Sequence, residues 1–371
     1  MTLSLVQLEQ AHLGFYVPSY RILVNGKDLL RQLFLEITQV QVDNTIQGAD
    51  RFSFTVNSAF NFENREFLLN KNFPLINDVF AFGSAVEIRW GYQDNKELPL
   101  MLRGKVTSVQ TSFPSGGLPQ ITVSGYDLSY CMTKGKKSRN WSDKTDSFIV
   151  SQIAQKDYGL NPQVQDTVVQ HPKTEQSQES DSQFLEKLAE RNGYEISVFD
   201  RDLIFKPPPK KEEEAKVSLE WGKGLLSFTP EINIAEQITK VEVRGWDVAT
   251  KKEIVGTATA GDEPNRDANR RSGGEVLKQV CRDQGELKVR KPVFSQQEAK
   301  RMAEAILKKR AELFVQGSGE SIGIPEIRAN TNIELLGMGK EFSKKYYVEQ
   351  ATHTISTSGY RTTFKIKDPT I

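Results

Sequence analysis

The chain has 371 residues, too many for one ordinary hydrophobic core and enough for two or three domains. Hydrophobic residues make up 37% and charged residues 26%, which is the profile of a soluble globular protein. Lys and Arg number 49 against 48 Asp and Glu, so the basic excess that is typical of nucleic-acid-binding proteins is absent, and we expect no nucleic-acid binding.

The cysteines and the start of the chain indicate where the protein is made. Cys131 and Cys281 are too few for a disulfide framework or a zinc site, which favours a reducing compartment. Residues Met1–Phe15 show no basic region followed by a cleavage site, and no apolar run approaches the roughly 20 residues that cross a bilayer. We expect synthesis in the cytoplasm without a signal peptide, and no membrane insertion by this chain.

The first third of the chain has the pattern of β-strands. Apolar and polar residues alternate, which is the period of a strand with one buried face, and Asn25-Gly26 is a strong hairpin signal. Short strands separated by turn-rich segments indicate a barrel or a sandwich. Strands are expected at Tyr20–Val24, Leu35–Val42, Arg51–Val56, Ala85–Tyr92, Leu100–Val109 and Gln120–Tyr126.

The period changes to that of helices after about residue 140. Apolar residues recur at helical spacing before Gly159, which is placed to end a helix. Ser180 and Gln183 form a capping box at the start of a second helix, which Gly193 ends. These helices and two following strands predict a small α+β module. The strands are expected at Tyr194–Phe199 and Leu203–Lys206.

A stiff, charged linker, Pro207–Glu214, marks a boundary, after which strand patterns return. Thr257–Gly274 is polar and rich in Gly and Arg, which predicts a mobile loop. One long helix is expected near residues 295–315, beginning at a capping box of Ser295 and Glu298. The later strands are expected at Val217–Glu220, Gln237–Trp246, Asn332–Leu336, Tyr346–Thr354 and Tyr360–Lys367.

Together these patterns predict a mainly β protein with an α+β insert. Residues 1–139 are expected to form a first β-barrel domain and residues 140–209 the α+β module. Residues 210–371 are expected to form a second β-barrel domain that contains the long helix.

The two β regions also share a pattern with each other. Val86-Glu87-Ile88 matches Ile333-Glu334-Leu335, and each triplet precedes a long alternating strand, a Gly-containing turn and a closing strand. Two ordinary β-meanders or a duplication would both produce this similarity. A duplication would mean two related barrels in one chain.

A search for reactive motifs nominates no site. Gly135-Lys136-Lys137 lacks the upstream glycine and the hydroxyl that a phosphate loop requires. His12, His171 and His353 are far apart in sequence, and no nucleophile elbow accompanies them. His353 falls in a predicted strand, where a structural role is favoured over catalysis. We therefore predict no enzyme and name no catalytic, cofactor-binding or metal-binding residue.

Two other features have alternative interpretations. The basic run Lys134–Arg139 could contact nucleic acid or an acidic partner, but a solvated loop is favoured in a chain of balanced charge. The tryptophans are favoured as core or interface residues rather than as a platform for stacking bases. They are Trp90, Trp141, Trp221 and Trp246.

An ordered set of motifs resembles one known family. Asp181–Tyr194, with Glu179-Ser180 before it, resembles a stretch of the late control D family of phage tail hubs, which also occurs in the hub half of VgrG proteins of type VI secretion. Gly224–Asp247 resembles the family's entry into its later barrel. Further matches follow in the expected order at Phe113–Pro119, Gly125–Leu128, Ser295–Ala299, Gly323–Ala329, Leu335–Gly339, Tyr346–Val348, His353 and Gly359–Phe364.

The resemblance implies two tube-like β-barrels in each subunit of a homotrimeric baseplate hub. Such a ring presents six barrels and joins the hexameric inner tube to a three-fold spike. The implied partners are further copies of the chain, the spike protein, the inner tube protein and the baseplate wedge proteins. The implied location is the baseplate of a phage tail or a phage-like injection particle.

VgrG proteins continue beyond the hub into a β-helical spike, whereas this sequence ends at Ile371. The spike is therefore expected to be a separate polypeptide. Two alternative functions stay open from the sequence: a tail-associated peptidoglycan hydrolase, and a module that binds a receptor or cargo.

Overall fold

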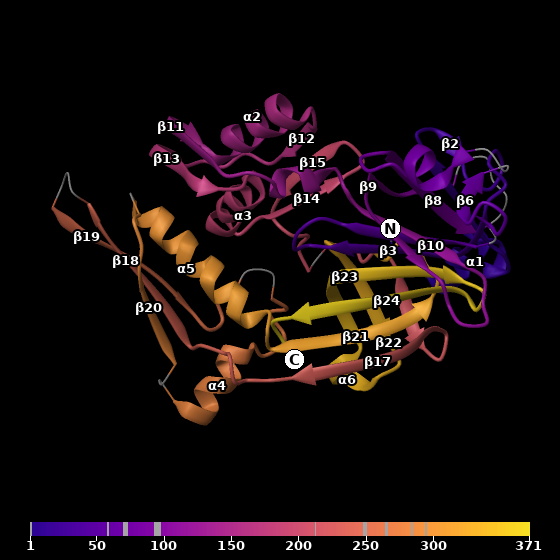
Figure 1. Cartoon of the computed structure of the whole chain (residues 1–371). Helices are drawn as coiled ribbons and strands as arrows, with labels where there is room; N and C mark the ends of the chain where they lie inside the picture. Colours follow the sequence, from indigo (N-terminus) through magenta and orange to yellow (C-terminus); the bar gives the residue numbers. More distant parts are fainter. Residues whose placement is uncertain are drawn as a thin grey trace.

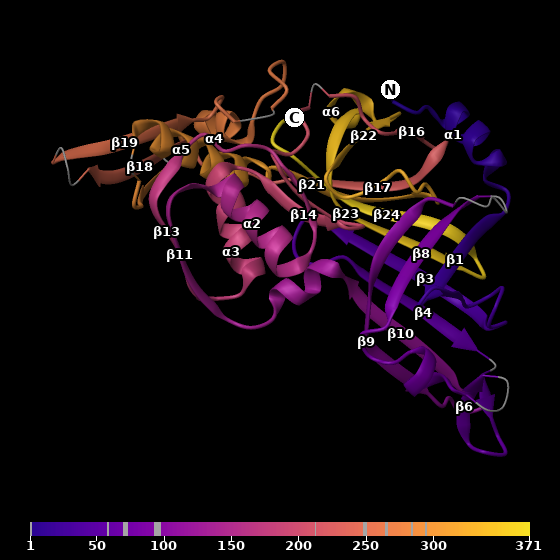
Figure 2. The same cartoon turned by 90° about the horizontal axis from the view of Figure 1, so that it is seen from above.

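The computed structural model describes the chain except residues 1, 58, 70–72, 93–97, 212, 248–250, 264–265, 283–284 and 294. Strands dominate it, and helices lie mainly in two insertions beside the largest sheet (Figures 1 and 2). The prediction of a mainly β protein with an α+β insert is confirmed.

The largest sheet has 13 strands, and its two parts are called the first half and the second half below. The first half consists of β1 (Pro18–Val24), β2 (Lys27–Asp28), β3 (Glu36–Thr45), β4 (Arg51–Asn57), β8 (Ala85–Tyr92), β9 (Leu100–Ser112) and β10 (Gln120–Asp127). The second half consists of β16 (Ser218–Trp221), β17 (Gly224–Ile232), β21 (Val315–Ile322), β22 (Thr331–Leu336), β23 (Lys344–Ser356) and β24 (Gly359–Asp368). The strand order is β2-β1-β8-β9-β10-β4-β3-β23-β22-β16-β17-β21-β24.

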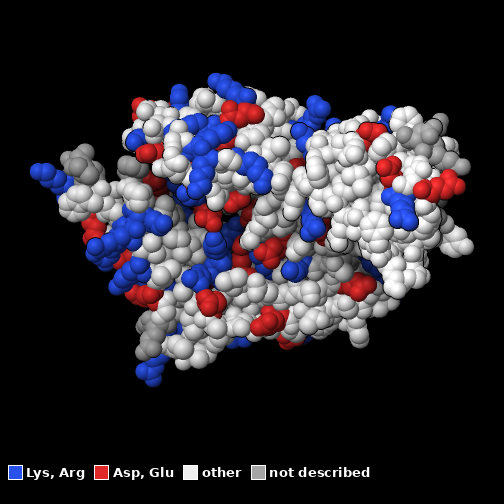
Figure 3. All heavy atoms as spheres, in the orientation of Figure 1, with Lys and Arg blue, Asp and Glu red and all other residues white. Residues whose placement is uncertain are grey.

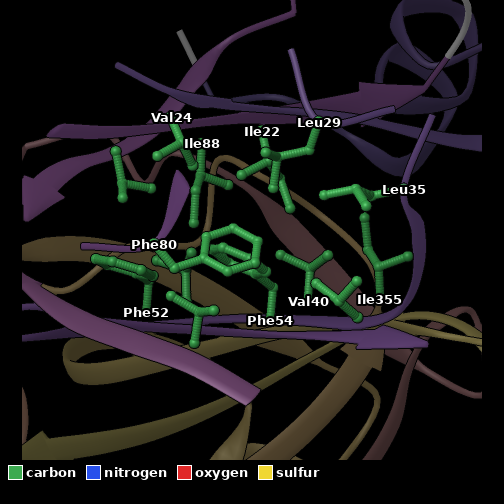
Figure 4. Packing of buried hydrophobic residues seen from close by; sticks show 14 of the residues in the cluster. Ile22, Val24, Leu29, Leu35, Val40, Phe52, Phe54, Phe80, Ile88 and Ile355 are labelled. Atoms are coloured by element: carbon green, nitrogen blue, oxygen red, sulfur yellow. The ribbon is translucent and has the colours of Figure 1, made fainter. Parts of the chain in front are cut away.

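The first half buries one face of its strands around an aromatic core. In β4, buried and partly exposed residues alternate, as the sequence predicts, so that Phe52 and Phe54 point to the same side. Phe80 packs edge-on against Phe54, with ring centroids 5.7 Å apart. Ile22 and Ile88 from the facing strands complete the packing, which Figure 4 shows. Burial of these side chains is the main stabilising term for this half.

The second half closes on itself. Its strands are paired in the cycle β23-β22-β16-β17-β21-β24, and β24 pairs again with β23. The inward-facing residues form a second hydrophobic cluster that includes Leu219, Ile333, Tyr346 and Phe364. A closed cycle leaves no free edge along the residues that are paired on both sides.

The two halves repeat one pattern of strand pairing. In the first half the order β3-β4-β10-β9-β8 is antiparallel throughout. In the second half the order β17-β21-β24-β23-β22 is antiparallel throughout. If the five strands of each half are numbered by their order in the sequence, their order in the sheet is first, second, fifth, fourth, third in both halves. The triplets that match in sequence, Val86-Glu87-Ile88 and Ile333-Glu334-Leu335, occupy corresponding strands, β8 and β22.

The registers repeat as well, including two β-bulges. The pairing of β10 with β9 skips Thr107, and the pairing of β24 with β23 skips Glu349. Likewise β4 skips Thr38 of β3, and β21 skips Leu226 of β17. Since a bulge is an irregularity placed at one residue, its recurrence on two corresponding strands favours a duplication over two unrelated meanders.

The α+β module packs two helices against two small sheets. Its elements are β11 (Lys137–Thr145), α2 (Asp146–Tyr158), β12 (Asn161–Val164), β13 (Gln170–Glu179), α3 (Asp181–Asn192), β14 (Glu195–Phe199) and β15 (Asp202–Lys206). The capping box of Ser180 and Gln183 is confirmed, and Gly159 and Gly193 end the helices in left-handed conformations. The sequence patterns did not reveal β11, β12 and β13, which are mostly polar.

A second insertion lies between β17 and β21. It contains β18 (Lys240–Asp247), β19 (Lys252–Thr259), α4 (Gly273–Cys281), β20 (Glu286–Arg290) and α5 (Gln296–Ala311). The predicted mobile loop at Thr257–Gly274 is wrong at both ends. Residues 257–259 complete β19, and Ser272 caps α4 through a capping box with Glu275.

The remaining short elements complete the chain. They are α1 (Leu5–Ala11), η1 (Leu13–Phe15), β5 (Phe60–Asn61), β6 (Glu66–Leu69), β7 (Phe73–Pro74), η2 (Leu75–Val79), η3 (Leu128–Thr133) and α6 (Gly339–Phe342).

Candidate interaction surfaces

The seam between the halves holds the most buried histidine. β3 pairs with β23 from Val40 opposite Ile355 to Thr45 opposite Gln350, which makes the two halves one sheet. His353 of β23 is fully buried there. Its Nε2 lies 2.9 Å from the carbonyl oxygen of Ile327. Because a carbonyl can only accept, Nε2 carries the proton and Nδ1 is the acceptor.

Tyr360 connects this histidine to the first half. Its hydroxyl lies 2.8 Å from Nδ1 of His353 and donates to it, and it accepts a hydrogen bond of 3.2 Å from Nε1 of Trp90. Burial, together with the nearby Arg328 charge, lowers the pKa of His353 to about 3. The ring is therefore neutral at physiological pH and held at both nitrogens, as the structural interpretation of His353 predicts.

The other two histidines lie elsewhere. Nε2 of His12 is 3.0 Å from Oε1 of Glu326, and His171 lies between Asp146 and Glu298 at 3.7 and 3.6 Å. Cys131 and Cys281 are exposed free thiols. In the described part of the chain, no three His, Cys, Asp or Glu side chains are grouped so as to hold a metal ion. The structure thus brings no two of the histidines together.

The basic run Lys134–Arg139 is not simply a solvated loop. Its second part begins β11, where Lys137 Nζ lies 2.6 Å from a carboxylate oxygen of the fully buried Asp181 side chain. Arg139 also forms an ion pair with Asp181. A buried carboxylate needs such partners, so these cations serve the folding of the module. Sequence spacing could not reveal this, because Asp181 lies 44 positions after Lys137.

A pair of aspartates lies where β4 begins and β10 ends. The sequence patterns did not indicate this pair. The backbone N–H of Asp50 donates to Asp127 Oδ2 over 3.2 Å, and the backbone N–H of Asp127 donates to the Asp50 carbonyl over 2.9 Å. Burial and, to a lesser extent, the nearby Asp50 carboxylate raise the pKa of Asp127 to about 7. Burial also raises the pKa of Asp50 to about 6.

Both aspartates predict a pH dependence of stability, and Asp127→Asn removes the part that comes from Asp127. With a folded pKa of about 7 against 3.8 for the ordinary group, the native state binds the proton more tightly than the unfolded chain. The contribution of Asp127 to the free energy of unfolding is therefore full below pH 3.8 and is lost as the pH rises through 7. Urea unfolding at pH 5 to 8 should show the wild type losing up to about 3 kcal/mol relative to the variant, since the pKa of about 7 lies about two units above the start of this range. A constant difference across this range would contradict the assignment.

Two exposed phenylalanines, Phe62 and Phe113, lie at the end of the first half that carries β6, whose place Figure 2 shows. Phe113 is 63% exposed, and its ring centroid lies 5.6 Å from that of Phe60 and 5.8 Å from that of Phe67. Phe62 packs edge-on against Phe60. We call Phe60, Phe62, Phe67 and Phe113 the aromatic end. Phe62 and Phe113 are exposed, and both rings pack against the half-buried Phe60, whereas Phe67 is buried. Exposed aromatic rings that lie close together are typical of a surface that another molecule covers.

The charged residues are distributed differently. Figure 3 has the orientation of Figure 1. On the face that it shows, Lys and Arg gather over the region where Figure 1 draws β18, β19 and α5. A cavity of about 420 Å³ lies between the α+β module, α5 and the second half, and charges of both signs line it. Its lining includes Glu190, Glu195, Lys308, Glu312 and Lys367. Within the described ranges, no helix combines the length and the apolar character required to cross a membrane.

Comparison with known sequences finds one family and one curated relative of note. A family model described as the Alg8 N-terminal domain matches residues 16–357. A protein described as a probable baseplate hub protein of Escherichia phage P2 is 27% identical over 192 residues, 51% of this chain and 45% of the phage protein. The match thus spans less than half of that relative's length.

Comparison with solved structures shows a shared fold. The 43 kDa tail protein of prophage MuSo2 from Shewanella oneidensis has a TM-score of 0.70 at 14% identity, over 95% of this chain and 99% of that one. A tail protein from Neisseria meningitidis gives 0.68 at 11% identity, over 95% and 97%. An Escherichia coli component of the type VI secretion system gives 0.57 at 10% identity, over 95% and 77%. The resemblance to hub and tail proteins is confirmed.

Proposed function

The chain belongs to the family described as the Alg8 N-terminal domain, and we propose that it serves as a structural baseplate hub of a phage tail or contractile injection system. The observation that carries this proposal is the duplicated pattern of strands, bulges and registers in the two halves. The phage relative and the fold shared with tail proteins support the same function.

The duplication suits an adaptor between different symmetries. Three copies of a chain with two similar halves present six similar positions, whereas the whole assembly keeps three-fold symmetry. We propose that a homotrimer of this kind joins a hexameric inner tube to a three-fold spike. Its further partners are then the spike protein, the inner tube protein and the wedge proteins, and its place is the baseplate of the particle.

The predicted division of the chain becomes part of this proposal. Residues 1–139 and 210–371 would supply the two tube-like domains, and residues 140–209 the module beside them. The hydrophobic clusters of the two halves and of the module support this division, although Leu8 packs in the cluster of the second half and Ile355 and Tyr360 in that of the first. Two observations support a role without catalysis. His353 is neutral and has a hydrogen bond at each ring nitrogen, and the three histidines lie in different parts of the structure.

A second candidate function is the binding of a receptor or cargo by the aromatic end. Its exposed rings favour that function, because apolar aromatic surface is typical of binding sites. The hub proposal accounts for more of the molecule, since it also explains the repeat. A peptidoglycan hydrolase stays the third possibility, and zymography of the purified protein would reveal it.

The hub proposal is tested by the mass of the purified protein in solution. Light scattering is measured on the protein alone and with the spike product of a neighbouring gene. We expect three copies in the complex with the spike. A monomer in both conditions, or lysis of peptidoglycan by the purified chain, would contradict the proposal.

A further inference from the structure

The α+β module is joined to the first half through η3. This short helix follows β10 directly and leads into β11. Leu128 and Met132 of η3 pack in the hydrophobic cluster of the module, whose members all lie between residues 128 and 205. The boundary between the module and the first half therefore falls at Asp127, which is the last residue of β10 and the N-cap of η3.

Polar contacts connect the module to the first half across this boundary. Nε of Arg103 on β9 lies 3.1 Å from Oδ1 of Asp200 in the module. The Arg328 guanidinium lies 4.3 Å from the centre of the Phe199 ring of the module, and it also donates to the carbonyl oxygen of Met101 over 3.0 Å. An interface of such contacts, between parts that each have a core of their own, allows one part to move as a body relative to the other.

The side chain of Asp127 holds both sides of this boundary. Its Oδ1 accepts hydrogen bonds from the backbone N–H of Ser129, over 2.8 Å, and from the Ser129 hydroxyl, which fixes the start of η3. Its Oδ2 accepts a hydrogen bond from the backbone N–H of Asp50 over 3.2 Å, directly before β4. One carboxyl group thus connects η3 to the first half.

The carboxyl group of Asp50 extends this connection to the turn between β3 and β4. It accepts hydrogen bonds from the backbone N–H of Thr45 over 2.9 Å and from Nδ2 of Asn44 over 2.6 Å. The turn, the start of β4 and the start of η3 are therefore held by two neighbouring carboxyl groups. Their hydrogen bonds form one unit, so a change at either group reaches the boundary of the module.

The charge on the two aspartates is what can weaken this unit. Burial is the main cause that raises the pKa of each, to about 6 for Asp50 and about 7 for Asp127. Among the described residues, the other charged groups that act on Asp50 are Arg328, which lowers its pKa, and Asp43, which raises it. The charged group that acts on Asp127 is Asp50, which raises its pKa. Two neighbouring carboxyl groups in a buried site resist being ionised together.

We propose that Asp50 and Asp127 form a proton-dependent latch, which holds η3 and the module against the first half while it is protonated and releases them when both groups are ionised. Release brings the two carboxylates into water, which relieves both their burial and their repulsion. The module stays joined to α5, for example by Lys309 Nζ at 2.7 Å from Glu190, so it turns and does not detach. The latch goes beyond the hub function and does not depend on the number of copies.

The direction of the pH effect follows from the raised pKa values. The closed latch binds protons more tightly than the open latch, in which the ordinary value of 3.8 applies. The closed state is therefore fully favoured below pH 3.8 and loses its advantage as the pH rises through 6 and 7. Between pH 6 and 8, ionisation of Asp127 alone should raise the ratio of open to closed molecules about tenfold.

Hydrogen exchange measured by mass spectrometry tests the latch. The protection factors are obtained by dividing out the intrinsic exchange rate at each pH. We expect those of residues 45–51 and 127–133 to fall about tenfold between pH 6 and 8 in the wild type. In Asp127→Asn, which keeps an acceptor oxygen but carries no charge, they should change less than about threefold. Asp262→Asn is the matched control, because Asp262 also accepts a backbone hydrogen bond, from Thr259, but lies in the second insertion.

A distance measurement tests whether the module moves. Cys131 and Cys281 are replaced by serine, and spin labels are attached to Thr111→Cys on β9 and Ser142→Cys on β11, both exposed positions. Double electron–electron resonance should give a displaced or broader distance distribution at pH 8 than at pH 5.5. The same labels in Asp127→Asn should give one distribution at both pH values. A label pair within the module, at Ser142 and Lys156, should be unchanged throughout.

The outcomes decide between the latch and a merely structural pair. Protection of η3 that does not depend on pH, or a pH response that persists in Asp127→Asn, would overturn the latch. Altered protection without any change in the distance distribution would overturn the release of the module. If Asp127→Asn does not fold, Asp50→Asn replaces it and should also reduce the pH response. The mass of the assembly is measured separately, so a failure of the latch leaves the hub proposal standing.

Discussion

Replacing Trp90 by alanine is expected to lower the free energy of unfolding by about 3–5 kcal/mol. The side chain is fully buried at the seam, so its removal leaves a cavity that the surrounding strands only partly fill. It also removes the hydrogen bond from Trp90 Nε1 to the Tyr360 hydroxyl. That hydroxyl belongs to the second half, so the change loosens the contact between the halves. Urea unfolding of the purified variant measures the loss.

The matched control is Trp246→Ala. Trp246 is 59% exposed, so the same truncation there should cost less than about 0.5 kcal/mol. Equal losses in the two variants would contradict the role given to Trp90. The seam sets how one half is oriented relative to the other. Under the proposed hub function, Trp90→Ala should therefore also reduce the fraction of trimers that light scattering detects. Trp90→Phe keeps most of the volume and should lose less stability than Trp90→Ala.

Replacing Asp146 by alanine is expected to cost about 3–5 kcal/mol, because it breaks a buried ion pair from one side. The Asp146 side chain is fully buried and accepts hydrogen bonds from Arg191, with Nε at 2.9 Å, and from Asn192, at 2.6 Å. Burial by itself would raise the pKa of Asp146, but His171 and Arg191 outweigh this and lower the pKa. This network ties the start of α2 to the end of α3.

Hydrogen exchange measured by mass spectrometry should localise the Asp146→Ala effect. We expect faster exchange in α2 and α3, and unchanged exchange in the second half of the large sheet. Asp166→Ala is the control, since Asp166 is exposed in the same module. Because a lowered acid pKa stabilises the fold only while the group is ionised, the wild-type advantage should shrink as the medium becomes acidic. An effect equal to that of Asp166→Ala would contradict the network.

The sequence by itself determined the features that depend on neighbouring residues. Alternation of apolar and polar residues located β4 and β10, because side chains of a strand point to opposite faces in turn. Ser180 with Gln183, and the glycines at 159 and 193, marked helix ends, because their effect is confined to one turn of the backbone. The matching triplets Val86-Glu87-Ile88 and Ile333-Glu334-Leu335 also indicated the repeat. Local patterns could not decide between a duplication and two meanders.

The tertiary structure decided what depends on residues far apart in the chain. The strands β11 and β13 are polar, and they exist because they pair with each other and because Asp181 holds Lys137 and Arg139. The start of α4 was hidden in a Gly- and Arg-rich segment, because two glycines, which are poor helix formers, open the helix. The repeated registers and the seam from β3 to β23 are relations between distant strands. No residue carries such a relation alone, so only the paired sheet could show that the two halves correspond.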